Sequence, residues 1–515
     1  MACKINSTPP FGTGEKNGHV EYETVLEAIG NGLYNVLLVL TCGLILLAIG
    51  VDLFGFGLVV SVACDLNITV AQKGILTSLP YVGILLVSYI WGYISDTCGR
   101  KFSLIVSVQA AFVLSCLASF STNWWILGLM KFLSVCFSCA ANSATYTLVG
   151  ESCIKRVRSK YMLLMTCLLI LSPGIGAVMS YPTLLLDFET EIPFLGINFT
   201  PWRLLIIVLA LPLGIGGAAI CFFHESPKFL INCDRNDEAI EVLQHMHSIN
   251  NRDSKDNFQV TSIYLEDAVA TKQTSLCRAM YELGAPLFRP PMLWRTLQLF
   301  FIVAVVYFTN NSLLVWLPYI MNTVMLSMEQ NTTTVGDICS VISINPTSEI
   351  NGTLSANATA ITPEVCLGYI EDNVIITLFM AQSIYAFLTF IISYLMKWRR
   401  IVLLTILTIS SLSGVLLNLM PEPISSVFLL MVFTCTNLGM GILASYFVDL
   451  YPTSCRGMVA CLSIMVGRTS TFIGINVVGN LIFYHCHVTF YMWALLVLSS
   501  VLAAWFLPPD KPLKS

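Results

Sequence analysis

Apolar runs of about 20 residues recur along almost the whole chain, and this repetition constrains the fold more than any other feature. A helix must be about that long to cross the hydrocarbon core of a bilayer, which is roughly 30 Å thick. Of the 515 residues, 56% are hydrophobic and only 11% are charged, whereas a soluble domain is about a quarter charged. We therefore predict an all-α membrane protein that crosses the bilayer repeatedly.

Twelve of these runs are long enough to be transmembrane helices. They cover approximately residues 34–62, 73–94, 102–121, 124–147, 160–181, 203–223, 296–320, 373–395, 401–419, 426–448, 458–482 and 489–507. Charged residues such as Glu15 and Lys16 precede the first run, and no short apolar core with a cleavage site does. We therefore expect no removable signal and an N-terminus that stays in the cytoplasm.

The distribution of basic residues predicts the orientation of these spans, because Lys and Arg accumulate on cytoplasmic loops. With both termini inside, all but four of the 26 Lys and Arg residues fall on cytoplasmic segments, the exceptions being Lys73, Lys131, Arg203 and Arg468. The loop 321–373 on the opposite side contains no Lys or Arg. The same topology suits the plasma membrane and an intracellular vesicle membrane, and the sequence does not choose between them.

Glycosylation acceptors test the orientation independently, because Asn-x-Ser/Thr sites are used only on the extracytoplasmic side. Five predicted sites fall there: Asn67, Asn198, Asn331, Asn351 and Asn357. The loop that holds the last three also contains Cys339 and Cys366. These two cysteines either form a disulfide in an oxidising compartment or remain free thiols.

Motifs for enzyme chemistry are missing from the sequence. Most of the other cysteines lie inside apolar runs and lack metal-ligand spacing. His245 and His247 lie in a stretch with helical spacing, which favours a surface helix over a metal site. There is no Walker A sequence and no nucleophile constellation. We expect no metal, no cofactor and no enzyme activity, and the net charge of −4 gives no basis for a nucleic-acid partner.

A polar central segment separates six spans from six. The expected units are a cytoplasmic tail (1–33), a six-helix bundle (34–223), a central cytoplasmic segment with short helices (224–295), a second six-helix bundle (296–507) that includes the extracytoplasmic loop 321–373, and a cytoplasmic tail (508–515). Charged turns recur at an offset of about 300 residues, which carries Arg100 and Lys101 onto Arg399 and Arg400. This repetition predicts two pseudo-symmetric bundles related by an axis along the membrane normal.

The turn after the second span resembles the loop motif of the major facilitator superfamily. It carries Gly92, Asp96, Gly99, Arg100 and Lys101. Three further segments, 225–230, 287–291 and 449–456, resemble the branch that contains synaptic vesicle glycoprotein 2 and the organic cation and anion transporters, and 28–34 and 316–318 look most like the vesicle-glycoprotein group. The resemblance implies a monomer, surrounded by membrane lipid, that transports a small organic solute by alternating access.

By the same resemblance, Asp96 and Arg100 join Glu151 and Arg156 in a cytoplasmic charge network that holds the halves together when the cavity faces outward. A carboxylate that faces the N-terminus of a neighbouring helix is also stabilising, by ~0.3 to 2 kcal/mol. The alternative is that these charges only fix the topology. Gly92 would permit a close helix approach and Gly99 a tight turn.

The corresponding turn of the second half departs from this pattern. Leu395 stands where Asp96 is expected, and Trp398 stands where Gly99 is expected. The offset still carries Glu151 and Arg156 onto two charged residues, which complete the predicted gate: Asp449 and Arg456. We therefore expect asymmetric closure.

Ionisable residues inside spans are costly and are candidates for function. We hypothesise that Asp52 and Lys131, on the first and fourth spans, pair and respond to protons; a purely structural pair, or no contact, is the alternative. Arg468 lies near the middle of the eleventh span, where the organic anion transporters carry an Arg by resemblance. A buried guanidinium binds carboxylate or phosphate and disfavours cations, so we expect an anionic or neutral solute. Transport would be uncoupled, or coupled to a proton or an exchanged anion.

Other polar or aromatic residues near mid-span either line a cavity or bond neighbouring helices. These candidates are Asn142, Tyr146, Tyr307, Asn310, Asn311, Trp316, Tyr385 and Asn437. A rival function remains open. The protein would be a vesicle glycoprotein that keeps the transporter fold but acts mainly in binding or trafficking, with little or no transport.

Overall fold

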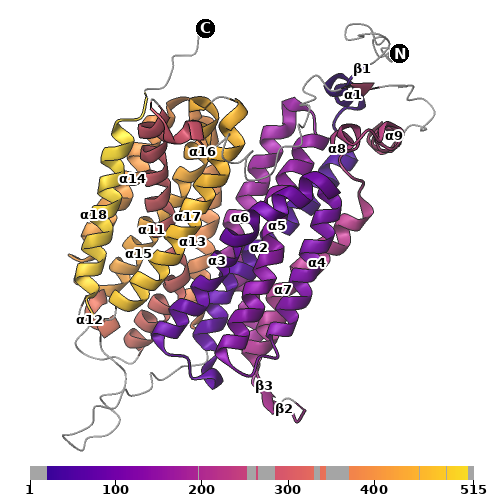
Figure 1. Cartoon of the computed structure of the whole chain (residues 1–515). Coiled ribbons are helices and arrows are strands. Elements are labelled where there is room, and N and C mark those ends of the chain that lie inside the picture. The colour runs from indigo at the N-terminus through magenta and orange to yellow at the C-terminus, as the bar shows by residue number, and fades with distance from the viewer. Residues whose placement is uncertain are drawn as a thin grey trace, which may run out of the picture.

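Long helices make up most of the described chain, and they are arranged side by side in two groups (Figure 1). The computed structural model describes residues 20–194, 196–251, 263–264, 285–290, 292–329, 337–343, 370–451, 453–482 and 484–508. Eleven helical segments in this part are long and apolar enough to cross a membrane. One of them, Asp372–Leu417, contains two helices separated by a 3-10 turn, so the described spans number twelve, as the sequence predicts.

The first half contains six long helices. They are α2 (Leu33–Val62), α3 (Val70–Cys98), α4 (Arg100–Ala118), α5 (Trp124–Ser152), α6 (Lys155–Leu184) and α7 (Pro201–Ala219). Local signals set some of their starts. The Thr69 side chain accepts a hydrogen bond from the Gln72 backbone N–H in a capping box before α3, and Pro201 occupies the first turn of α7, where its missing N–H costs nothing.

The second half repeats this arrangement with one interrupted span. Its helices are α11 (Met292–Glu329), α13 (Asp372–Leu395), α14 (Arg399–Leu417), α15 (Pro423–Phe433), α16 (Gly439–Leu450), α17 (Thr453–Leu481) and α18 (Cys486–Trp505). A 3-10 turn, Thr434–Leu438, joins α15 to α16 within a single crossing. Sequence periodicity predicts one continuous span there.

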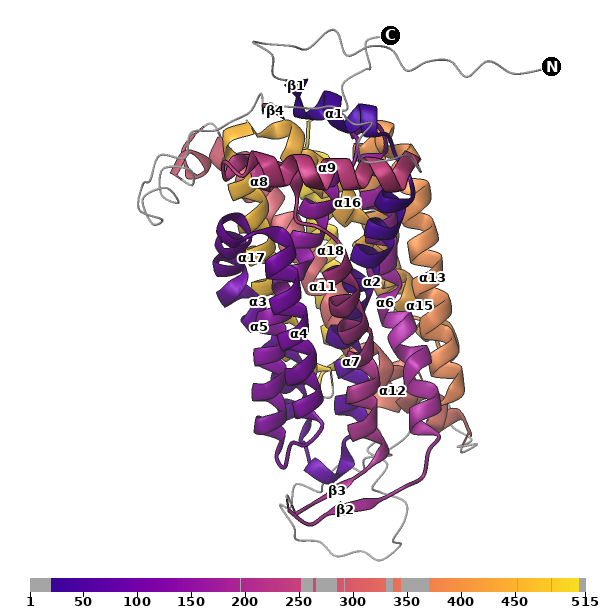
Figure 2. The same cartoon turned by 90° about the vertical axis from the view of Figure 1, so that its right-hand side faces the viewer.

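Short elements cover the two ends of the bundle. At the end where α18 finishes, here called the tail end, lie α1 (Tyr22–Ile29), α8 (Pro227–Asn232), α9 (Asn236–Asn251) and the parallel pair of β1 (Val20–Glu21) and β4 (Ile263–Tyr264). At the opposite end, the loop end, lie α12 (Ile338–Ser343) and the antiparallel pair of β2 (Thr190–Ile192) and β3 (Ile197–Phe199). Figure 2 shows α9 lying across the ends of the first-half helices.

The described hydrophobic core joins the two halves through a large cluster at the loop end and a small one formed by Tyr81, Ile84, Val135 and Ile475. One cluster combines first-half residues such as Val59 and Trp202 with second-half residues such as Trp316 and Phe433. At the tail end, one cluster is built from the first half and the central segment, and a separate one has all its fully buried members in the second half and the segment before it. Apolar burial therefore holds the halves together at the loop end and leaves them apart at the tail end.

Three helix pairs carry the contact between halves: α3 with α17, α6 with α13, and α2 with α11. Polar contacts supplement them near the loop end. The Asn476 amide donates to Ser78 Oγ at 2.9 Å, the Tyr181 hydroxyl donates to Asp372 Oδ2 at 3.3 Å, and Lys73 Nζ lies 5.1 Å from the centre of the Tyr319 ring. No such polar contact between the halves is seen at the tail end of the described chain.

Candidate functional site

A cation that has no anionic partner among the described residues lies at the seam between the halves. The Arg468 guanidinium, on α17, lies 5.6 Å from the ring centre of Tyr81 on α3 and 5.7 Å from that of Tyr307 on α11. Its Nε is buried and has no hydrogen-bond partner, and Arg468 forms no ion pair within the described part of the chain. Aromatic rings attract a cation through their faces, but they do not neutralise its charge. Arg468 is therefore placed to receive an acceptor.

Tyr81 belongs to this site and is not among the residues predicted from the sequence. Its hydroxyl is buried and, like Arg468 Nε, has no hydrogen-bond partner. Tyr81 is a phenol inside an apolar helix, and the criterion that selected Tyr307 would have found it. Two unsatisfied polar groups at one place, on helices from opposite halves, are what a site for a polar ligand requires.

The α11 candidates pack against α17 near this site. The Asn311 amide donates to Thr471 Oγ1 at 3.0 Å, and Asn310 donates to Asn311 Oδ1 at 3.0 Å. The Trp316 indole N–H donates to the Ile475 carbonyl at 3.0 Å. These three side chains are buried, and the bonds of Asn311 and Trp316 join α11 to α17, so they position α17 and thereby Arg468. A Cβ on Gly467 would lie 2.6 Å from the Tyr307 ring, so this glycine makes room for it.

Asp52 and Lys131 form the ion pair that the sequence suggests, but inside the first half and away from the seam. Lys131 Nζ lies 2.6 Å from Asp52 Oδ1, and both side chains are 3% exposed. Ser115 Oγ also donates to Asp52 Oδ1 at 2.9 Å and bonds Ser134 Oγ at 2.9 Å. The pair thus links α2, α4 and α5 and is neutral as a unit.

The remaining mid-span candidates make local contacts or none in the described chain. The Tyr146 hydroxyl bonds Thr166 Oγ1 at 3.0 Å within the first half, and Tyr385 bonds Thr434 Oγ1 at 2.7 Å within the second. Asn142 and Asn437 are half-buried, and their side chains form no hydrogen bond with any described residue.

At the tail end, the predicted gate turn is part of a network inside the first half. Arg100 Nη2 lies 3.1 Å from Asp96 Oδ1, and Arg100 Nε lies 3.1 Å from Glu151 Oε2. Arg100 and Glu151 are largely buried, at 10% and 15% side-chain exposure, whereas Asp96 is 73% exposed. The Arg100–Glu151 pair therefore contributes more to stability than the screened Asp96–Arg100 pair.

The central segment completes this network, which the sequence did not reveal. The Glu225 carboxylate accepts the backbone N–H groups of Arg100 at 2.9 Å and Lys101 at 3.0 Å, so it caps the N-terminus of α4. Ser226 Oγ donates to Glu151 Oε2, and the Phe229 ring lies 5.0 Å from the Arg100 guanidinium. The segment 225–230 was noted only as a family resemblance, because 125 residues separate Glu225 from Arg100.

Helix α1 also contacts this network. The Tyr22 hydroxyl donates to the Glu151 carbonyl at 2.7 Å. Burial, followed by the nearby Glu151 carboxylate, raises the pKa of Tyr22 well above its ordinary value, so the phenol remains a donor. Glu23 pairs with Arg158 at 3.3 Å.

Two residues of the predicted first-half gate make no such contact in this conformation, and the network itself, which is expected in the outward-facing state, stays a prediction. Arg156 is exposed and forms no ion pair with a described residue, because the start of α6 presents Arg158 to Glu23 instead. No heavy atom of the described chain lies within 4 Å of a Cβ built on Gly92, so this glycine serves no close helix approach here. Gly99 has φ +109°, which makes the tight turn as predicted.

Aromatic rings lie beside both arginines of the second-half turn. The Arg399 guanidinium lies 4.4 Å from the Tyr446 ring centre, and that of Arg400 lies 5.8 Å from the Trp505 ring centre and donates to the Trp505 carbonyl. The side chains of Asp449 and Arg456 lie outside the described residues.

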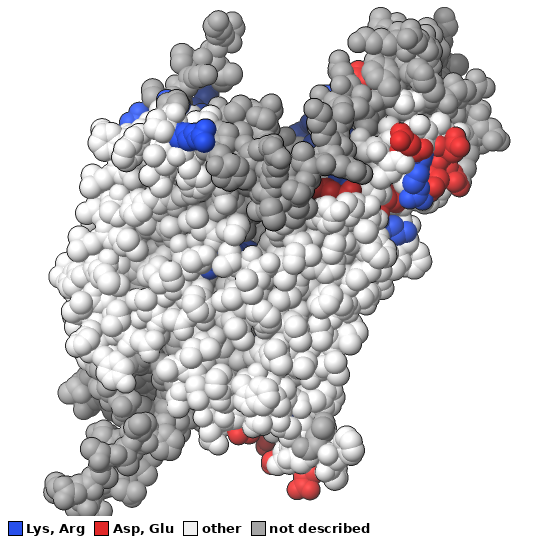
Figure 3. All heavy atoms as spheres, in the orientation of Figure 1, with Lys and Arg blue, Asp and Glu red and all other residues white. Residues whose placement is uncertain are grey.

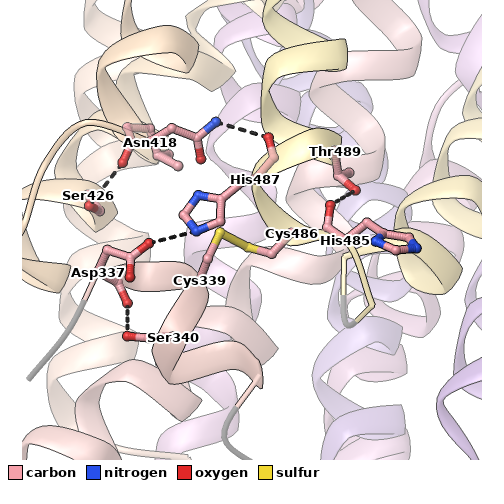
Figure 4. The surroundings of a disulfide bond; sticks show 10 residues. Asp337, Cys339, Ser340, Asn418, Ser426, His485, Cys486, His487 and Thr489 are labelled. Atoms are coloured by element: carbon pink, nitrogen blue, oxygen red, sulfur yellow. Dashed lines mark hydrogen bonds and ion pairs between the residues drawn. A yellow bond between two sulfur atoms is a disulfide. The ribbon is translucent and has the colours of Figure 1, made fainter.

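The loop end corrects the predicted disulfide. Cys339 on α12 is bonded to Cys486 at the start of α18, so the pairing of Cys339 with Cys366 is wrong (Figure 4). Cys339 and Cys366 share one loop in the sequence, whereas the fold packs α12 onto α18, which brings Cys339 to a cysteine 147 residues away. Cys366 lies outside the described residues. Beside the disulfide, His487 Nε2 lies 3.1 Å from Asp337 Oδ2. Asp337, Cys339 and His487 are grouped closely enough for metal ligands, but the disulfide leaves Cys339 without a thiolate.

Two of the five predicted glycosylation sites lie in the described chain. Asn67, in the left-handed region before α3, and Asn198, on β3, are both exposed at the loop end. The other three, Asn331, Asn351 and Asn357, lie outside the described residues.

Similarity to known proteins agrees with this arrangement. A family model described as Major Facilitator Superfamily matches residues 40–345, more than half of the chain. Synaptic vesicle glycoprotein 2C of Rattus norvegicus is 28% identical over 234 residues, which cover 45% of this chain and 32% of that protein. Synaptic vesicle glycoprotein 2A of Homo sapiens is 26% identical over 255 residues, which cover 47% of this chain and 34% of that protein. The chain thus matches about a third of the length of these relatives.

Solved structures resemble the fold over nearly its full length. The xylose transporter XylE from E. coli in a partially occluded inward-open conformation aligns with a TM-score of 0.64 and 11% sequence identity, covering 94% of this chain and 100% of XylE. Its inward-open conformation aligns with a TM-score of 0.65. At this level of identity the likeness shows the fold alone.

Proposed function

Because this chain belongs to the major facilitator superfamily, a family of membrane transporters and not of enzymes, we propose that it is a secondary transporter that moves a small organic solute, anionic or neutral, by alternating access. The observation that carries the proposal is the Arg468 guanidinium, which lies at the seam with a buried Nε and no anionic partner in the described chain.

The chemistry of Arg468 favours a carboxylate or another acceptor-rich group. A half-buried cation without an anionic partner in the described chain is costly, and an anion in the site would reduce that cost through bidentate hydrogen bonds. The Tyr81 hydroxyl adds a second unsatisfied group from the other half. A cationic solute would meet repulsion at the same place. A ligand held between Tyr81 and Arg468 contacts both halves, as alternating access around one site requires.

The conformation supports access from the tail end. The halves share one core at the loop end and have separate cores at the tail end, and solved neighbours of the same fold are described as inward-open. The excess of Lys and Arg on the tail-end segments favours a cytoplasmic tail end. We therefore assign this structure to a state that faces the cytoplasm, in the plasma membrane or a vesicle membrane.

The opposite state requires the tail ends to meet. Asp96 is exposed here, and it would then reach the second half, where a carboxylate is stabilising at the positive N-terminus of a helix such as α17. Asp52 and Lys131 remain candidates for proton coupling, and a purely structural pair remains the alternative. If the protein exchanges one anion for another, transport does not require these two residues to take up or release a proton.

Substitution of Arg468 tests the proposal. In vesicles reconstituted with the purified protein, we expect uptake of a responsive organic anion to fall roughly 10- to 100-fold in Arg468→Gln, since charge-assisted hydrogen bonds are lost. Arg468→Lys keeps the charge but loses the bidentate hydrogen-bond geometry, so its uptake should lie between that of the unmodified protein and that of Arg468→Gln. Arg289→Gln, which changes an exposed arginine away from the seam, is the matched control. Preferred uptake of tetraalkylammonium ions by the unmodified protein would contradict the proposal.

A second candidate function is binding or trafficking with little or no transport. Two observations favour it: the similarity to synaptic vesicle glycoproteins 2A and 2C, and a second-half gate turn that lacks the acidic residue. An uptake screen over organic anions, nucleosides and sugars separates the two functions. Ligand binding that depends on Arg468, without translocation under imposed pH or voltage gradients, would favour this candidate.

A further inference from the structure

Side chains with metal-ligating atoms meet at the loop end, where α12 packs against α18 (Figure 4). The atoms that Asp337, Cys339 and His487 offer as ligands lie within 4.8 Å of one another. Cys486 is bonded to Cys339 and therefore brings a second sulfur to the same place. We call these side chains the loop-end cluster. Sulfur, imidazole nitrogen and carboxylate oxygen are the ligand atoms that Zn²⁺ binds in proteins.

Neighbouring residues hold the backbone of the cluster in place. Ser340 Oγ donates to the Asp337 carbonyl at 2.7 Å, and the Asn418 amide donates to the His487 carbonyl at 3.1 Å. Both cysteines are buried, whereas the His487 side chain is 53% exposed. The ligands are therefore positioned from outside the cluster, and an ion in solution has a path to them past His487.

The surface charge at the loop end favours a cation. On the face that Figure 3 shows, the described side chains at this end include acidic ones and no basic ones. Lys73 and Arg203, which lie near the loop-end starts of α3 and α7, are only 8% and 1% exposed. An acidic surface raises the local concentration of cations.

We propose that the loop-end cluster binds Zn²⁺ when the disulfide between Cys339 and Cys486 is reduced. A dithiol cleaves the S–S bond and is itself oxidised to a disulfide, and its two protons pass to the cysteine sulfurs. Zn²⁺ then displaces both protons and is bound by two thiolates, His487 Nε2 and an Asp337 oxygen. The intact disulfide has no thiolate and does not bind the ion. The proposal does not depend on the solute or on transport.

The geometry of the cluster requires only small movements. Ligand bonds of about 2.0 to 2.3 Å place the ligand atoms of a tetrahedral zinc site roughly 3.3 to 3.8 Å apart. His487 Nε2 and Asp337 Oδ2 are already 3.1 Å apart. The cysteine Cα atoms are 5.5 Å apart, so rotation of the side chains separates the sulfurs far enough once their bond is cleaved. Bound zinc keeps α12 fixed to α18 in the reduced protein.

Metal titration of the purified full-length protein tests the proposal. Protein reduced with a dithiol, which is then removed under nitrogen, should bind Zn²⁺ that the oxidised protein does not bind, as counted by native mass spectrometry. Co²⁺ added in place of Zn²⁺ should give the intense absorption of a tetrahedral ion bound by thiolates. Equal zinc binding before and after reduction overturns the proposal, as does the absence of binding to the reduced protein.

Substitutions assign the ligands. Cys339→Ser should remove one bound zinc ion from the reduced protein. His487→Ala and Asp337→Asn should each weaken binding of that ion roughly tenfold or more, since even the neighbours of metal ligands contribute that much. His487→Cys replaces one zinc ligand by another and should keep the ion, which separates loss of a ligand from misfolding.

Two variants outside the cluster are the matched controls. His485→Ala changes an exposed histidine that points away from the cluster, and Cys461→Ser changes an exposed thiol on α17. Both should bind zinc as the unmodified protein does. Full zinc binding by Cys339→Ser would assign the ion to other thiols and contradict the proposal, and so would equal losses in His485→Ala and His487→Ala.

Discussion

At the scale of single residues, the turn between α3 and α4 shows how one backbone angle and one carboxylate depend on each other. Gly99 has φ +109°, where L side chains are strained, and a Cβ there would lie 2.4 Å from Glu225 Oε2. The sequence predicts the tight turn, because glycine precedes a charged pair between two apolar runs. It does not reveal that Glu225 fills the space left by the missing side chain.

Alanine at two glycines of this motif should separate their roles. Gly99→Ala should destabilise the protein by about 1 to 3 kcal/mol, because it adds backbone strain and displaces Glu225. Gly92→Ala is the matched control: it meets no described atom within 4 Å and removes a glycine from a helix, so stability should stay equal or rise by up to about 1 kcal/mol. Thermal unfolding of both purified variants is the measurement. Similar losses in both would show that the tight turn is not what distinguishes Gly99.

At the scale of elements, the two halves carry different residues at their equivalent turns. In the first half, α4 is capped by Glu225, and Arg100 is held by two carboxylates. In the second half, Arg399 lies over Tyr446 with no acidic residue at the equivalent position. The two turns thus differ in sequence, since Leu395 stands where the first half has Asp96, and asymmetric closure stays a prediction.

Removal of the α4 cap should weaken the first half selectively. Glu225→Ala takes away the acceptor for two backbone N–H groups, and we expect a loss of about 0.5 to 2 kcal/mol together with faster proteolysis at the α3–α4 turn. Glu238→Ala, which breaks only the exposed pair with Arg235, should cost less than about 1 kcal/mol. Unfolding temperature and limited proteolysis check both. If Glu238→Ala is as destabilising as Glu225→Ala, the cap is not the stabilising contact.

At the scale of the whole molecule, access is decided by which end of the seam is packed. The described loop end has a shared core and polar contacts across the seam, whereas the tail end has two separate cores. For the proposed transport cycle, the contact of Ser78 with Asn476 must break each time the loop end opens.

Covalent closure of the loop end should therefore stop transport. Ser78 Oγ and Asn476 Nδ2 are 2.9 Å apart, so cysteines at both positions should crosslink on mild oxidation and abolish uptake. Reductant should restore it. Each single-cysteine variant, treated identically, controls for the native thiols. Full uptake by the crosslinked double variant would mean that the loop end does not open between Ser78 and Asn476.

The sequence by itself determined the twelve spans and the two-bundle fold. A helix that crosses the lipid must be apolar over about 20 residues of its own sequence, whichever helices it packs against. It also selected Arg468 and Asp52 with Lys131, since charge inside an apolar run is conspicuous on its own. Tertiary structure alone decided the rest: Glu225 as the cap of α4, Cys486 as the partner of Cys339, and Tyr81 beside Arg468. These features depend on contacts between residues far apart in the sequence. Such contacts are set by how the helices pack, and the local sequence pattern does not predict them.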